Sequence, residues 1–171
     1  KDLNLSKDEL AHEAWRLENE VIGRFGGKQD QYAATYGGIN QIFVGKEVLV
    51  RPIITPHVDK LLSSLVLVYL GGVREEGLQE NLKTLTKDKL EALLRIKKIA
   101  ILAMDYIKVG DIEMVAKLLN QSWGEKKKTN NVSNKTIDEA YDIGMMSGAW
   151  GGKLLGSGQG GYFVFVVDPE K

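Results

Sequence analysis

The chain has 171 residues, of which 43% are hydrophobic and 27% charged, so it is long enough to bury a core and has a globular composition. Its 23 lysine and arginine residues balance 23 aspartate and glutamate residues, which gives no reason to expect a nucleic acid or an anionic membrane as partner. The lack of cysteine excludes disulfides and thiolate metal sites and fits a cytoplasmic location, and no apolar run reaches the roughly 18 residues of a membrane span. Because the chain opens on Lys1 without an initiator methionine, we expect it to be part of a longer protein.

The first part of the chain predicts two helices. Ser6 and Glu9 have the spacing of a capping box, and apolar residues then recur at helical spacing, so a helix is expected over residues 6–22. Gly23 is expected to end this helix because glycine tolerates the backbone angles that stop one. A short second helix is expected over residues 30–36.

Strands are expected after the second helix. Residues 39–44 and 47–53 are strand-like, and Gly45 and Lys46 predict the turn that joins them. The apolar run at residues 64–70 is compatible with a buried strand.

Three helices are expected in the middle of the chain. The first covers about residues 87–108, and its apolar stripe consists of Leu93, Ile96, Ala100, Ala103 and Ile107. Asp111 and Asn134 can cap the other two. The inner face of the second helix consists of Ile112, Val115, Ala116, Leu119 and Trp123. The third carries small residues every four positions, which lets a neighbouring element pack close to Ala140, Gly144 and Gly148.

The chain closes with two further strand-like segments, residues 150–155 and 162–167, on either side of a glycine-rich loop. Strands, three helices and a final strand pair predict an α+β fold, in which an antiparallel sheet carries helices on one face. The run Lys126-Lys127-Lys128 followed by Thr129-Asn130-Asn131 predicts a polar connection. The tryptophans are expected to be core anchors rather than a stacking platform for bases: Trp15, Trp123 and Trp150.

Asp30 is the first candidate for chemistry, because it lies between the glycine pairs Gly26-Gly27 and Gly37-Gly38 at a predicted helix start. A carboxylate presented in this way can take a proton from a substrate hydroxyl, but aspartate at a helix start also commonly serves as a cap. Lys28 can stabilise negative charge beside Asp30 or be an ordinary solvated lysine. The local pattern leaves both alternatives open.

The second candidate is the loop at residues 156–161, called the glycine loop below. Successive backbone amides of such a loop can hold an anion, whereas glycines between two strands more often form a hairpin or a bulge. The loop lacks the ending of a Walker motif and the strand–loop–helix context of a dinucleotide site. Lys153, just before the loop, is ambiguous in the same way.

Carboxylates on the first helix are the candidates for a metal site. Glu18 or Glu20 could reach a magnesium ion near Asp30, although a charged helix face is usually only solvated.

Taken together, the two glycine segments resemble conserved segments of the GHMP kinase superfamily. One is residues 27–38 after the helical segment 13–22, and the other is residues 148–162, which look like the third motif of that family. Residues 120–128 resemble the segment that precedes this motif. The order and separation of these segments agree with those of the family, and the likeness is to its D-glycero-D-manno-heptose 7-phosphate kinase branch.

The resemblance implies phosphoryl transfer from ATP with Mg²⁺ to a hydroxyl of a sugar or sugar phosphate. Asp30 matches the catalytic aspartate of the family, and Lys28 is a candidate to assist it. The acceptor would be bound by Gln29, Gln31, Tyr36 and Gly37. The third motif, which borders the phosphates, corresponds to Gly156, Ser157, Gly158, Gly160 and Gly161. The candidates for binding magnesium are Glu18 and Glu20.

Two departures from the family pattern qualify this prediction. Ser157 and Gln159 interrupt what is usually a nearly continuous run of glycines. Nothing matches the first two motifs of the family, so residues 1–38 look like the end of an N-terminal segment and residues 39–171 like the C-terminal domain. The chain by itself is therefore expected to be inactive, with an N-terminal kinase half as its partner. The alternative is a non-catalytic protein of the same fold that binds a metabolite or a partner.

Overall fold

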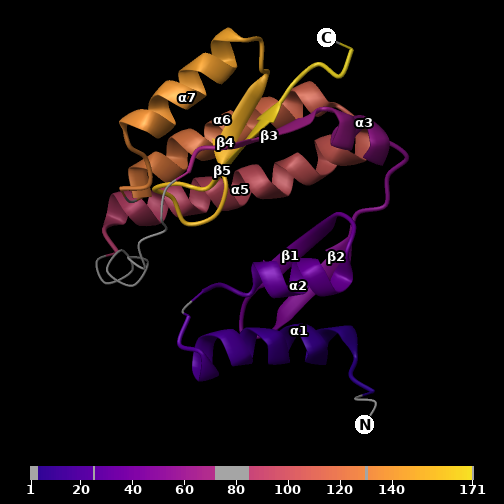
Figure 1. Ribbon diagram of the computed structural model, residues 1–171. Helices are drawn as coiled ribbons and strands as arrows, with labels where there is room; N and C mark the ends of the chain where they lie inside the picture. The colour runs from indigo at the N-terminus through magenta and orange to yellow at the C-terminus, as the bar shows by residue number, and fades with distance from the viewer. Residues whose placement is uncertain (1–3, 25, 72–84, 130, 171) are drawn as a thin grey trace. The chain divides into compact units, whose positions relative to one another are not determined.

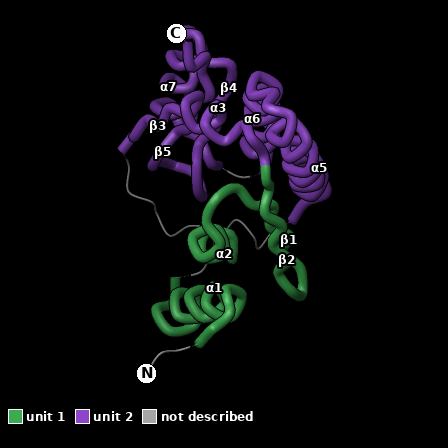
Figure 2. Tube along the Cα trace, turned by 90° about the vertical axis from the view of Figure 1, so that its right-hand side faces the viewer, with its two compact units in different colours: residues 1–54 green, residues 55–171 purple. Residues whose placement is uncertain are grey.

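The computed structural model describes all residues except 1–3, 25, 72–84, 130 and 171. The described residues belong to two compact units, residues 1–54 and residues 55–171, and each is presented by itself (Figure 2). The predicted division at residue 38 concerns family segments, and it stays a prediction. Within the described ranges, no helix combines the length and the apolar character needed to cross a membrane.

The first unit is built from two helices and a strand hairpin (Figure 1). Its elements are α1 (Lys7–Arg16), the π-helical turn η1 (Leu17–Val21), α2 (Gln29–Tyr36), β1 (Asn40–Val44) and β2 (Val48–Pro52). The predicted capping box is confirmed, since the Glu9 amide donates to the Ser6 hydroxyl and the Ser6 amide donates to the Glu9 carboxylate. Helices α1 and α2 pack against each other and bury Ala11 and Tyr32.

The hairpin is confirmed, with a longer loop than the sequence predicts. Strands β1 and β2 are antiparallel, and Val44 pairs with Val48. The loop therefore has a third residue, Glu47, whose carbonyl accepts a hydrogen bond from the Gly45 amide at 3.0 Å.

The second unit contains a three-stranded antiparallel sheet of order β3-β5-β4, with helices packed against it (Figure 1). Its elements are α3 (Val58–Ser63), β3 (Leu65–Tyr69), α5 (Lys87–Val109), α6 (Ile112–Thr129), α7 (Lys135–Met146), β4 (Gly151–Leu154) and β5 (Tyr162–Val166). The α+β prediction is confirmed, and the antiparallel strands form two separate sheets. The core of this unit consists of Trp123, Val132, Ile137, Leu154, Phe163 and Phe165.

Two glycines let the helices approach closely enough for this core to form. A Cβ atom built on Gly151 would overlap the carbonyl oxygen of Ala116 in α6, and one built on Gly144 of α7 would overlap the ring of Phe165. The prediction that small residues on the third helix permit close packing is therefore confirmed at Gly144. On the far side of β4 from β5, the Gly152 amide donates to Asn120 Oδ1 of α6 at 2.8 Å, so the helix also satisfies the open edge of this strand.

Strand β3 is present, but the prediction that it is buried is wrong. All five of its residues are exposed, with Leu67 and Tyr69 about 60% exposed. The reason is its position, because β3 is at the edge of the sheet and pairs only with β5 among the described strands. An apolar run predicts a strand but does not say where in a sheet it lies.

The predicted stripe of α5 is only partly correct. Ile96, Ala103 and Ile107 are at least half-buried, whereas Leu93 and Ala100 are exposed and Ala92 is fully buried. The helix carries apolar residues on two faces, and packing against α6 selects the one that includes Ala92.

The lysine run is not a connection between helices, because it lies in the last turn of α6. Cations are favoured at a helix C-terminus, and each lysine finds a partner there. Lys126 donates to the carbonyl of Gly156, and Lys128 pairs with Glu125 at 2.6 Å. The Lys127 amine lies 5.7 Å from the Trp123 ring centroid and 3.5 Å from the Asp138 carboxylate. Asn130, part of the same prediction, is outside the described residues.

Replacing Gly151 with alanine tests the close approach of α6 and β4. We expect Gly151→Ala to destabilise the fold by about 1–3 kcal/mol, since the added methyl group meets backbone rather than a flexible side chain. Gly124→Ala is the matched control, because no atom lies within 4 Å of a Cβ at Gly124 and alanine favours a helix by roughly 0.5–1 kcal/mol. Urea unfolding measures both. Equal stability of the two variants would contradict the packing described here.

Candidate functional site

Asp30 is the second residue of α2, and its side chain is exposed. The helix begins at Gln29 with Lys28 as its N-cap, so the alternative in which Asp30 caps the helix is excluded. Within the described part of the chain, the Asp30 carboxylate makes no hydrogen bond or ion pair. A carboxylate in the first turn is stabilised by the helix dipole, and this one is left accessible.

The residues before Asp30 are arranged around Trp15. The Lys28 amine lies 4.5 Å from the centroid of the Trp15 ring, as in a cation–π contact. Trp15 is partly exposed, unlike the core anchor the sequence predicts, and its Nε1 donates to the carbonyl of Gly26 at 3.1 Å. Gln29 is exposed. The structure thus holds Lys28 on an aromatic ring and does not pair it with Asp30.

Gln31 joins α2 to the π-helical turn. Its Nε2 donates to Glu18 at 2.7 Å, while its Oε1 is buried and has no hydrogen-bond donor among the described residues. Glu20 lies 3.9 Å from Arg16. Across the described ranges, no three side chains of the types that bind metals come together. Glu18 and Glu20 are therefore engaged with neighbours, and their part in a magnesium site stays a prediction.

Tyr36 and Gly37 finish α2. The Tyr36 hydroxyl donates to the Asp8 carboxylate at 2.8 Å, and this hydrogen bond raises the pKa of Tyr36. Gly37 follows with a φ of 68°, which favours glycine. Both residues therefore fix where the helix ends and how it rests on α1.

The glycine loop connects β4 to β5, so it is a strand connection as the simpler prediction held. Gly156, Gly158, Gln159 and Gly161 all have positive φ. The amides of Ser157, Gly158 and Gly160 donate no hydrogen bond to any group in the described ranges, whereas the Gly161 amide donates to Gly71 at 2.9 Å. Unpaired amides in such a loop can receive an anion.

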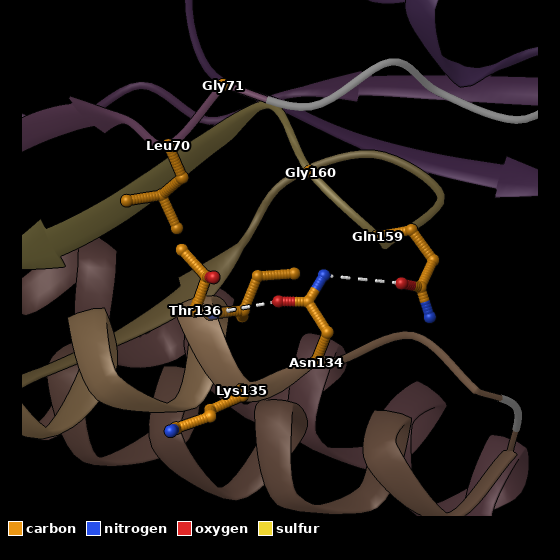
Figure 3. A pocket seen from close by; sticks show the side chains of 8 residues that line it. Leu70, Gly71, Asn134, Lys135, Thr136, Gln159 and Gly160 are labelled. Atoms are coloured by element: carbon orange, nitrogen blue, oxygen red, sulfur yellow. Dashed lines mark hydrogen bonds between the residues drawn. The ribbon is translucent and has the colours of Figure 1, made fainter.

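A pocket of about 330 Å³ opens beside this loop (Figure 3). One wall is formed by Leu70, Gly71 and Gly160, and the other by Asn134 and the first turn of α7. The Asn134 side chain caps α7 by accepting a hydrogen bond from the Ile137 amide at 3.1 Å.

Lys153 is the second charged group that the sequence leaves ambiguous, and its surroundings are unusual. It lies in β4 opposite Val164 and is largely buried, and burial lowers the pKa of its amine. No described group forms a hydrogen bond or an ion pair with it. A largely buried ammonium without a partner is suited to bind an anion. In the sequence, the only feature that points to a functional role of Lys153 is its position just before a glycine loop.

The predicted site residues fall into two groups. Asp30 and its neighbours belong to the first unit, and the glycine loop, the pocket and Lys153 belong to the second.

Comparison with known families assigns both groups to the same lineage. The family described as GHMP kinases N terminal domain matches residues 1–38, and the family described as GHMP kinases C terminal matches residues 103–171. The chain belongs to the GHMP kinases. The resemblance read from the two glycine segments is confirmed.

Two curated relatives extend this result. The GHMP chain is 35% identical over 178 residues to D-glycero-alpha-D-manno-heptose 7-phosphate kinase from Campylobacter jejuni, covering 99% of this chain and 52% of the relative. It is 28% identical over 201 residues to galactokinase from Pyrococcus furiosus, covering 99% of this chain and 56% of the relative. The chain thus spans about half the length of the curated relatives it matches.

Solved structures of other kinases are also similar to this chain. Mevalonate kinase from Methanococcus jannaschii superposes with a TM-score of 0.70 at 26% identity, covering 99% of this chain and 51% of the other. Galactokinase from Lactococcus lactis, solved with galactose, gives a TM-score of 0.73 at 18% identity, covering 99% and 53%. The second likeness shows the fold alone.

Replacing Lys153 with methionine tests whether this lysine is kept at the expense of stability. Since burial lowers its pKa, the folded state holds the Lys153 proton less tightly than the unfolded chain does. The charge therefore destabilises the fold below the lowered pKa, and this effect disappears as the pH rises to the ordinary lysine value of 10.5. We expect Lys153→Met to raise the urea midpoint at pH 7 and to lose this advantage near pH 10.5.

Lys117→Met is the control for this experiment. A hydrogen bond to Glu113 raises the pKa of Lys117, so its removal should bring no gain at pH 7. A Lys153→Met midpoint equal to or below that of the unmodified chain at pH 7 would contradict the prediction.

Proposed function

We propose that the protein carrying this chain transfers a phosphoryl group from ATP to a hydroxyl of a sugar or sugar phosphate, with Asp30 as the base. The observation that carries the proposal is the exposed, unpartnered carboxylate of Asp30 in the first turn of α2, within the segment that matches the family. The similarity to a heptose 7-phosphate kinase and to galactokinases supports the class of acceptor.

Asp30 would accept the proton of the acceptor hydroxyl as its oxygen attacks phosphorus. Phosphoryl transfer needs little covalent chemistry from a protein, because most of the barrier is lowered by in-line positioning and by neutralising charge. A carboxylate with no ion pair of its own among the described residues is free for that proton. Lys28, stacked on Trp15, is the nearest cation in sequence that could offset the charge.

Gln31 is the strongest candidate in the first unit to bind the acceptor. Its Nε2 is fixed by Glu18, and its buried Oε1 lacks a donor in the described ranges. An unpaired buried amide oxygen is unfavourable, so a sugar hydroxyl that reached it would gain a hydrogen bond without displacing another. Gln29, Tyr36 and Gly37 would shape the surroundings of the acceptor.

The second unit would contact the phosphates. The free amides of Ser157, Gly158 and Gly160 and the unpaired ammonium of Lys153 are the anion-binding groups that the described residues offer there. We propose that the main phosphate loop of the site comes from residues outside this sequence, which would make the chain inactive by itself. Glu18 and Glu20 stay the candidates for magnesium, although no cluster of three metal-binding side chains occurs among the described residues.

The alternative is a non-catalytic GHMP-fold protein that binds a metabolite or a partner. Ser157 and Gln159 favour it, because they occupy positions in the loop where the family usually has glycine. Binding without turnover would distinguish it from the kinase.

Replacing Asp30 with asparagine tests the assigned base. In the protein that carries this chain, we expect Asp30→Asn to lower turnover by about 100-fold or more while leaving ATP affinity within about twofold, since the amide cannot accept the proton. ADP release with heptose 7-phosphate, galactose or mevalonate as acceptor measures turnover, and calorimetry measures ATP binding.

Asp105→Asn on α5 is the matched control, because Asp105 is exposed and has no partner in the described part of the chain. It should behave like the unmodified protein. Near-normal turnover of Asp30→Asn would remove the assignment.

A further inference from the structure

Gln159 has an unusual backbone conformation for a residue with a side chain. Its φ is 63°, and it is the one non-glycine residue with positive φ in the described ranges. Glycine adopts this conformation without a steric penalty, whereas glutamine does not. The surrounding contacts must therefore hold Gln159 in place.

Those contacts all reach one segment, residues 131–134, called the connection below because it leads from α6 to α7. The Gln159 amide donates to the Val132 carbonyl at 3.0 Å. Its side-chain Nε2 donates to the Asn131 carbonyl at 2.6 Å and to the Ser133 carbonyl at 3.4 Å. Its Oε1 accepts from Asn134 Nδ2 at 3.3 Å, as Figure 3 shows. Both ends of the carboxamide are satisfied by the connection.

The backbone of the loop comes equally close. A Cβ atom at Gly158 would lie 2.8 Å from the Cα atom of Val132, so only glycine fits at that point. Lys126 holds the start of the loop through the Gly156 carbonyl, and the Gly161 amide holds its end through Gly71. Gln159 fixes the middle.

We propose that Gln159 is a positioning residue, which fixes the glycine loop against the connection and so preorganises the pocket beside α7. Asn134, its partner, also caps α7, so one pair of side chains sets both walls of the pocket (Figure 3). A loop with four glycines is otherwise expensive to order on binding, and a loop ordered in advance binds more tightly. That Gln159 holds the loop in place does not depend on the proposed function, whereas its effect on ATP affinity does.

The experiment compares two variants in the protein that carries this chain. Gln159→Glu keeps the size of the side chain and removes the two hydrogen bonds that Nε2 donates to the connection. Gln159→Gly removes the side chain but suits the positive φ, so this variant is not expected to be lost through misfolding. Gln121→Ala is the control, because Gln121 is exposed on α6 and has no partner in the described ranges.

Amide hydrogen exchange is the first measurement. We expect exchange at Ile137 and Gly161 to accelerate roughly 5- to 30-fold in both variants, since one or two lost hydrogen bonds change an opening equilibrium by about fivefold each. Met114 is the internal reference, because its amide is capped in the same way by Asp111 at 3.0 Å and should not change. Unchanged exchange at Ile137 and Gly161 in both variants would overturn the proposal.

ATP affinity and the split between KM and kcat are the second measurement. We expect the Kd and the KM for ATP to rise roughly fivefold or more, with kcat at saturating ATP within about twofold, because the loop must be ordered on binding. Faster exchange with unchanged ATP affinity would reduce Gln159 to a structural contact and overturn the positioning role. If the unmodified protein binds no ATP, the proposed function fails, and the exchange result still tests whether Gln159 holds the loop.

Discussion

The distance between β4 and α6 is the constraint on which the second unit depends. At Gly151 there is no room for a side chain between strand and helix, and at Gly144 the same holds between α7 and Phe165. Because α6 lies this close, Asn120 can satisfy the edge of β4, and Trp123 can pack edge-on against Phe163 with ring centroids 5.8 Å apart. Gly151, which lies in the segment that resembles the third motif, thus has a packing role before any role in chemistry.

The same close packing positions the candidate site. The last turn of α6 brings Lys126 to the first residue of the glycine loop. The connection, residues 131–134, then contacts the middle of the loop at Gln159. A loop made mostly of glycine is thereby held at three points while several of its amides remain unpaired in the described part of the chain. Fixed but unsatisfied donors are what an anion site requires.

Three features of the described residues are unfavourable for stability by themselves. Lys153 is a largely buried ammonium without a partner, Gln159 has positive φ, and Gln31 has a buried oxygen without a donor. All three lie in or beside the segments that match the family. Local rules of folding are commonly broken where a site needs a group held ready, which supports the proposed assignments.

The sequence predicts the elements well and their surroundings less well. The capping box, the hairpin, the helices and the final strands follow from local pattern, and the structure confirms them. The exposure of β3, the inner face of α5 and the helical lysine run could not be predicted, because each depends on a partner distant in sequence. At Asp30 the structure excludes the cap, one of the two alternatives that the local pattern leaves open. The role of Asp30 as a base rests on family resemblance and stays a prediction.

The central claim is that this chain contributes a carboxylate and a set of amides to a sugar kinase. The most direct test gives the protein that carries the chain ATP labelled at the γ-phosphate, together with heptose 7-phosphate, galactose or mevalonate. We predict that label appears on heptose 7-phosphate or galactose, and not on mevalonate, in step with ADP. Bound ATP whose γ-phosphoryl group reaches none of the acceptors would contradict the claim and favour the non-catalytic alternative.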